Sequence, residues 1–296
     1  MMRLMTIAAA LLLPTLAVGA EPIQLKPQIG DAYEIMSDRE SSQQSNDGSS
    51  GSSTDQDSLI ERVVGVRDTG LELEYDLPES AAAGDRASSW QFPLRVFKPL
   101  HGPLQLLNGP ELEARVDDWL KANGMTRAAC GHWIFTWNTF RIECDPQSVI
   151  KTLEAWDLAP DDLRDGALYK DPKARGPAPL KRQKAGPDGA TFKVEMAVDP
   201  EAVRREQAEG DIVAAEIVHK QTLTLDAALR ARSAEVISGT ITIIFETDSA
   251  GEVRRRTRVT RLEIKGPGQR VETQIVKDIM ERRRVSKPAP DWRRTA

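Results

Sequence analysis

The sequence is poor in the residues that build most catalytic and metal centres. It holds two cysteines and three histidines among 296 residues, and aromatic residues make up 5% of it. It contains no GxSxG elbow, no HExxH motif and no phosphate-binding P-loop. With so few thiols and imidazoles, we expect neither a tetrahedral zinc site nor any other cofactor. A non-catalytic protein is therefore the favoured interpretation.

Long apolar runs are missing after residue 20, but one short run opens the chain. Arg3 precedes an apolar stretch at 4–13, and small residues follow it up to Ala20. This order is typical of a secretory signal peptide. The run is shorter than the roughly 20 apolar residues of a membrane-spanning helix. We therefore expect residues 1–20 to be a cleaved signal peptide and the mature chain to be periplasmic or secreted, without a transmembrane anchor.

The two cysteines, Cys130 and Cys144, agree with export. In an oxidising compartment, an isolated pair at this separation is expected to form a disulfide. The alternative is a pair of buried thiols in a reduced protein. The signal peptide favours the disulfide.

Charge is unevenly distributed along the chain, whose net charge is −5. Residues 21–170 contain 14 basic and 26 acidic residues, whereas residues 250–296 contain 14 basic and 6 acidic ones. Either the two regions attract each other within one fold, or the basic region binds anionic lipid headgroups, glycans or an envelope protein. Nucleic acid is not an expected partner, because the chain is acidic overall and carries no nucleic-acid-binding motif.

Two polar segments suggest the organisation of the mature chain. Residues 41–58 contain no apolar side chain, so we expect an unstructured, mobile tip of a β-hairpin. Residues 171–189 are rich in proline and basic residues and are interpreted as a connector. They separate an N-terminal half, 21–170, from a C-terminal half, 190–285. Residues 286–296 are expected to form a disordered tail.

Strand patterns dominate the sequence. The clearest alternation of apolar and polar residues runs through 192–198, and 237–245 repeats it. Earlier strands are expected at 31–40, 59–66, 71–77 and 90–97. Residues 270–282 fit both a strand and a helix, and the short turns before them favour a strand.

Helix patterns are fewer. Apolar stripes indicate helices at 111–122 and 145–156, and a third helix is expected after Asp199-Pro200, with an interruption at Gly210. The order of elements predicts an α+β fold in which a few helices pack on one face of an extended antiparallel sheet. Whether that sheet is curved stays open.

The segment between the cysteines is the most distinctive candidate site. Alternation places Trp133, Phe135 and Trp137 on one side of a strand and His132 on the other. One interpretation is an aromatic wall that lines a cleft for a sugar or an acyl chain. The other, commoner role of such a stripe is core packing against the tryptophans of neighbouring helices.

A run of arginines provides a second candidate. Arg254, Arg256 and Arg258 share one face of a predicted strand, where exposed guanidinium groups would bind phosphate or carboxylate groups. Acidic residues on the adjacent strands are the alternative partners.

Three hypotheses follow. The leading one is a non-catalytic, exported envelope protein that binds a hydrophobic or amphiphilic ligand, or an envelope partner. The alternative is an envelope hydrolase whose site is assembled around His132 from residues distant in sequence. The third is a structural protein whose basic C-terminal strands contact an acidic partner.

Overall fold

A computed structural model describes residues 27–135, 139–219 and 222–285. The predicted signal peptide, 1–20, and the predicted tail, 286–296, lie outside these ranges. The described chain is mostly antiparallel sheet with a few helices, and the sheet is not closed. This part of the predicted fold class is confirmed.

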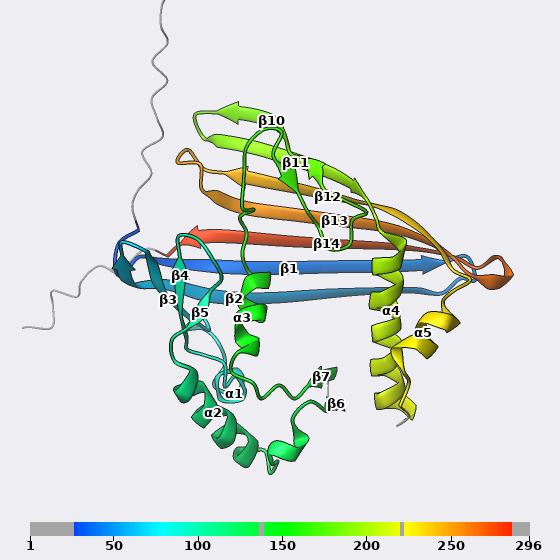
Figure 1. Ribbon diagram of the computed structural model, residues 1–296, viewed down its shortest axis with the longest axis horizontal. Helices are drawn as coiled ribbons and strands as arrows, with labels where there is room; N and C mark the ends of the chain where they lie inside the picture. Colours follow the sequence, from blue (N-terminus) through cyan, green and yellow to red (C-terminus); the bar gives the residue numbers. More distant parts are fainter. Residues whose placement is uncertain (1–26, 136–138, 220–221, 286–296) are drawn as a thin grey trace, which may run out of the picture.

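Ten strands form one antiparallel sheet (Figure 1). Their order is β10-β11-β12-β13-β14-β1-β2-β3-β4-β5, so the last strand in sequence pairs with the first. Strands from both predicted halves therefore belong to one sheet. The bounds are β1 Ala32–Ser45, β2 Ser50–Arg67, β3 Gly70–Asp76, β4 Leu94–Pro99, β5 Gln105–Leu106, β10 Lys181–Gly186, β11 Gly189–Ala197, β12 Val236–Thr247, β13 Val253–Lys265 and β14 Val271–Arg284.

Two small sheets and a few helices complete the described structure. The first small sheet pairs β6 (Trp133–Phe135) with β7 (Thr139–Arg141), and the second pairs β8 (Leu168–Tyr169) with β9 (Ala178–Pro179). The helices are α1 Ala83–Ser88, α2 Gly109–Ala122, α3 Ser148–Ala155, α4 Pro200–Ala214 and α5 Leu225–Ala231, with short helical turns at Arg127–Ala129, Ala215–His219 and Pro267–Gln269. In the described ranges, none of these helices has the length and hydropathy of a membrane span.

Two predictions about polar segments were wrong. Residues 41–58 form the end of β1 and the start of β2, joined by a turn at 46–49, so the hairpin is present but its arms are ordered strands. The side-chain composition of 41–58 does not reveal this order, because the order comes from backbone hydrogen bonds, which every residue other than proline can form on both sides. Strand β1 is hydrogen-bonded to β2 on one side and to β14 on the other. Residues 171–189, predicted as a connector, contain β9 and β10.

The helices follow their apolar stripes. Leu112, Val116 and Leu120 of α2 are all buried, as the spacing predicts. The side chain of Asp199 caps α4 by accepting a hydrogen bond from the backbone N–H of Glu201 at 3.0 Å. Contrary to expectation, α4 continues through Gly210. The ambiguous segment 270–282 is strand β14, as its preceding turns favour.

The hydrophobic core involves one face of the ten-stranded sheet, which we call the core face. Cross-strand pairs such as Val63 with Leu73 and Phe192 with Phe245 are buried on it. The same cluster includes buried residues of α2, α3 and α4. In Figure 1, α3 lies toward the end of the sheet that carries β3, β4 and β5, and α4 and α5 lie toward the other end.

Candidate ligand-binding cavity

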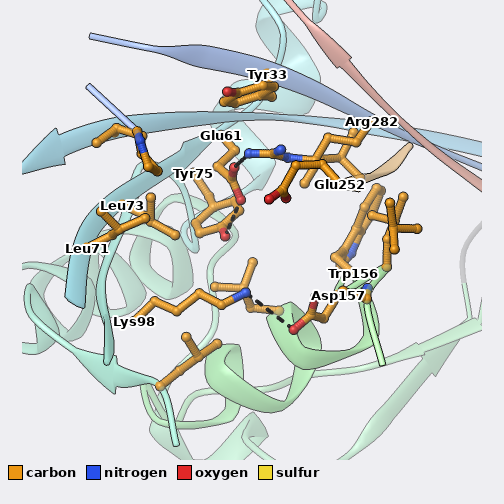
Figure 2. Close-up of a pocket in the computed structure, with 18 residues that line it drawn as sticks. Tyr33, Glu61, Leu71, Leu73, Tyr75, Lys98, Trp156, Asp157, Glu252 and Arg282 are labelled. Carbon is orange, nitrogen blue, oxygen red and sulfur yellow. Dashed lines mark hydrogen bonds and ion pairs between the residues drawn. The ribbon is translucent and has the colours of Figure 1, made fainter. Parts of the chain in front are cut away.

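A cavity of about 220 Å³ opens on the core face, where the start of β1 and the strands β2 and β3 meet the end of α3. Figure 2 shows side chains from these elements arranged around it. The residues that line it are Pro27, Tyr33, Ile35, Glu61, Val63, Leu71, Leu73, Tyr75, Lys98, Leu104, Leu153, Trp156, Asp157, Leu158, Ala159, Glu252, Val253 and Arg282.

Apolar side chains form most of its walls. Leu71 and Leu73 both face the cavity because alternate residues of a strand share a face. The opposite wall comes from Leu153 of α3 and from Trp156, which directly follows that helix. The site therefore combines side chains of β3 with side chains from the end of α3.

A buried ion pair interrupts this apolar lining. Arg282 of β14 donates through Nη2 to Oε1 of Glu61 at 2.5 Å, and the Tyr75 hydroxyl donates to Oε2 of the same carboxylate at 2.7 Å. The guanidinium carbon of Arg282 also lies 3.5 Å from the ring centre of Tyr33, as a cation–π contact. Since the Glu61 side chain is only 10% exposed, these partners replace the water that its charge would otherwise bind.

The electrostatics of this network oppose proton exchange. Burial, and then the negative charge of Glu61, raise the pKa of the Tyr75 hydroxyl well above its usual value. Burial lowers the pKa of Arg282, but attraction and hydrogen bonding to Glu61 outweigh it, so the pKa of Arg282 is raised. Tyr75 therefore stays neutral and Arg282 stays charged at neutral pH. The network is therefore a fixed polar feature of the cavity wall.

The more exposed polar groups of the cavity come from other elements. Lys98 Nζ lies 3.4 Å from Asp157 Oδ2, and both side chains are about half exposed. Arg256 Nη1 donates to the backbone carbonyl of Asp157 at 2.6 Å, which ties the segment after α3 to β13. Glu252, just before β13, is exposed. The cavity is thus apolar along its walls and charged where it meets water.

A second cavity of about 200 Å³ lies beside the first and shares Leu153 and Trp156 with it. Its other lining residues are Leu59, Gln91, Phe92, Leu94, Val149 and Thr152. The end of α3 therefore separates two apolar spaces on the core face.

The size of the first cavity limits what it can hold. A dry apolar cavity of roughly 150 Å³ binds benzene, whereas pockets for drug-sized molecules measure roughly 300–1,000 Å³. At about 220 Å³, the cavity holds a ring or a short alkyl segment but not a whole lipid. A larger amphiphile would place only its apolar end inside.

The predicted aromatic site is distinct from this cavity. The Cys130–Cys144 disulfide is confirmed, with Cα atoms 5.7 Å apart. Trp133 is half-buried in β6. The side chain of Phe135 and all of Trp137 lie outside the described part of the structure, so the aromatic wall stays a prediction.

His132, the centre of the hydrolase hypothesis, is exposed. Its side chain is 69% accessible, and its Nδ1 lies 4.0 Å from Oε1 of Glu216. Among the described residues, no hydroxyl or further acidic group is hydrogen-bonded to it. Within the described residues, His132 has one distant carboxylate beside it, and the nucleophile that the hydrolase hypothesis requires is not identified.

The predicted anion-binding arginines do share one face, but it is the core face and not an exposed one. Arg254 binds Asp248 at 2.6 Å, and Arg256 donates to the carbonyl of Asp157. Arg258 is 18% exposed and forms a two-bond contact with Asp171 through Nε at 2.9 Å and Nη2 at 3.3 Å. Alternation predicted their shared face. Arg256 and Arg258 find their partners in segments far away in sequence, whereas Asp248 lies six residues before Arg254.

The buried network was missed by sequence reasoning, although β2 carries a signal for it. Leu59, Glu61 and Val63 occupy alternate positions, so an acidic residue stands within an apolar stripe. A charged residue at a core-facing position is rarely buried without a partner. That pattern predicts a buried ion pair but does not identify Arg282 as the partner.

Comparisons with known proteins do not place the chain in a family. No family model matches it, and no curated protein does. Among solved structures it is similar to one described as "lipid-protein interactions in lipovitellin", with 9% sequence identity and a TM-score of 0.36. The similarity covers 88% of this chain and 26% of the other, so the chain spans about a quarter of that protein.

Proposed function

We propose that this chain is an exported envelope protein that binds the apolar end of an amphiphilic molecule in the 220 Å³ cavity. The observation that supports this most is the composition of the cavity, with aliphatic and indole walls and a buried Arg282–Glu61–Tyr75 network at one side. Binding sites for small molecules commonly combine such walls with a few oriented polar groups.

The proposal includes the finer architectural expectation that helices close the cavity against one face of the sheet. Trp156 and Leu153 lie on the helical side, and Leu71 and Leu73 lie on the strand side. An alkyl segment between them would remove apolar surface from water on both sides, which favours binding by about 25 cal/mol for each Å² buried. The signal peptide predicted at 1–20 agrees with the same proposal, because the envelope is rich in amphiphiles.

The first test is native mass spectrometry of the protein purified gently from its own cells. We expect a co-purifying amphiphile whose mass is lost on mild activation. The second test uses the fluorescent probe anilinonaphthalene sulfonate with dodecanoate as the competitor. Displacement of the probe by dodecanoate, but not by acetate, is the result expected for an apolar cavity.

A matched pair of variants locates the binding. Leu71→Trp places a large ring in the cavity, whereas Glu74→Trp adds the same ring to the same strand on the opposite face. We expect Leu71→Trp to weaken dodecanoate binding by roughly tenfold or more, and Glu74→Trp to leave it unchanged. Equal affinities in a folded Leu71→Trp variant and the wild type would contradict the proposal.

A further inference from the structure

Three exposed aliphatic side chains stand at the end of the sheet beside the cavity. Ile29 is 65% exposed, Val66 is 48% exposed and Leu100 is 70% exposed. They belong to three separate segments, namely the chain before β1, the end of β2 and the residue after β4. We call them the aliphatic rim.

The pairing of the strands connects Val66 with the cavity. Val66 pairs with Leu71, and Leu71 pairs in turn with Lys98. Cross-strand partners share a face of the sheet, and both Leu71 and Lys98 line the cavity. Val66 therefore lies beside Leu71 on the same face of the sheet, next to the apolar wall of the cavity.

Backbone hydrogen bonds hold the other two members near the same end. The N–H of Leu100 donates to the carbonyl of Thr69 at 2.9 Å, which joins the loop after β4 to the turn between β2 and β3. The N–H of Gly30, next to Ile29, donates to the carbonyl of Val63 at 2.8 Å. Pro27, two residues before Ile29, lines the cavity.

Two basic groups near the rim are already paired, whereas Asp68, in the turn that follows Val66, is exposed. Arg67 forms a salt bridge with Glu72, and its guanidinium carbon lies 5.2 Å from the ring centre of Phe97. Lys98 is paired with Asp157. Both of these cations therefore already have an anionic partner. The chemistry of the rim is apolar.

We propose that the aliphatic rim inserts into the surface of a phospholipid bilayer and brings the cavity against it. The inference rests on the proposed function, because an amphiphile with an apolar end is dissolved in a bilayer and would reach the cavity without crossing water. Three separate protruding side chains also suit a fluid surface better than a protein partner, whose stable interface involves roughly 20–30 residues on each side.

The test is sedimentation of the purified mature protein with phosphatidylcholine vesicles, with and without phosphatidylglycerol. We expect binding to both kinds of vesicle, and binding that persists in molar salt because it depends on apolar insertion. The triple variant Ile29→Ser/Val66→Ser/Leu100→Ser removes the rim from exposed positions. We expect it to bind vesicles at least roughly tenfold more weakly.

Val236→Ser is the matched control, since Val236 is 64% exposed and lies at the start of β12, toward the other end of the sheet. It should bind vesicles like the wild type. Wild-type protein that does not bind vesicles, binding that disappears in salt, or an equal loss in the Val236→Ser control would each overturn the inference.

Dodecanoate binding in solution separates this inference from the proposed function. The rim variant should still bind dodecanoate, and Leu71→Trp should still bind vesicles. If the wild type binds dodecanoate but not vesicles, bilayer docking is wrong and the cavity proposal stands. If it binds vesicles through the rim but not dodecanoate, the cavity proposal fails and the docking surface stands.

Discussion

Arg282 and Glu61 form a 2.5 Å ion pair although they are 221 positions apart in the sequence. Arg282 lies on β14 and Glu61 on β2, and strand β1 runs between them. The pair therefore fastens the C-terminal strand to the N-terminal hairpin at the wall of the cavity. It is one of several contacts between the basic C-terminal region and acidic residues earlier in the chain, such as Arg284 with Asp31.

Removing one member of this pair should destabilise the folded protein. In Glu61→Leu, Arg282 keeps a largely buried charge without its carboxylate, so we expect the free energy of unfolding to fall by roughly 3–5 kcal/mol. The double variant Glu61→Leu/Arg282→Met should recover most of that loss, because neither charge remains buried. Urea denaturation measures both effects.

The partly exposed pair of Arg62 and Glu74, 3.7 Å apart on the neighbouring strands, supplies the control. Glu74→Ala should change the free energy of unfolding by about 1 kcal/mol or less, since water screens the pair. A Glu61→Leu variant no less stable than Glu74→Ala would show that the buried pair is not important for stability.

Tyr75 should make stability fall at alkaline pH. Its pKa is raised in the folded state, chiefly by burial and then by Glu61. Below the unfolded pKa of about 10, both states hold the proton. As pH rises above that value, the unfolded chain releases it while folded Tyr75 retains it, so the folded state binds more protons and loses relative stability. Tyr75→Phe should show a shallower decline of unfolding free energy over this range, and an identical decline would contradict the assignment.

The contribution of Arg258 to stability should depend on the shape of its guanidinium group and not only on its charge. Lysine cannot form the two bonds from Arg258 to Asp171. We expect Arg258→Lys to lower the free energy of unfolding by roughly 1–3 kcal/mol. Arg261→Lys, at an exposed position of the same strand, should be nearly neutral.

The same variant tests whether these arginines bind anions. Because Arg258 is already paired with Asp171 and Asp278, added phosphate should not raise the melting temperature of the wild type. A clear rise that Arg258→Lys abolishes would restore the anion-binding hypothesis.

Export and the disulfide can be checked on the native protein. We expect its N-terminus at Glu21 and no thiol that reacts under denaturing conditions without a reductant. Replacing both Cys130 and Cys144 by serine should lower stability by roughly 3 kcal/mol, the effect expected of a loop of about this length. A native product that retains Met1 and two free thiols would contradict export.

Local patterns predicted much of the fold but little of the candidate site. Alternation identified the strands around Val194 and Ile243, and the spacing of Leu112, Val116 and Leu120 identified α2. The prediction of an unstructured tip at 41–58, made from composition, was wrong. Backbone pairing of β1 to two neighbouring strands orders this segment although it has no apolar side chains. The site was missed because its lining comes from segments that are distant in sequence.

The amino-acid sequence alone determined which residues share a face, that Asp199 caps a helix, and which two cysteines can be joined, because these depend on the short-range geometry of the backbone. It also placed an acidic residue, Glu61, within an apolar stripe. Only the tertiary structure decided that Arg282, Tyr75 and Tyr33 surround that residue and that the end of α3 lines a cavity beside it. Strand order and helix position depend on the packing of the whole core, which no local pattern specifies.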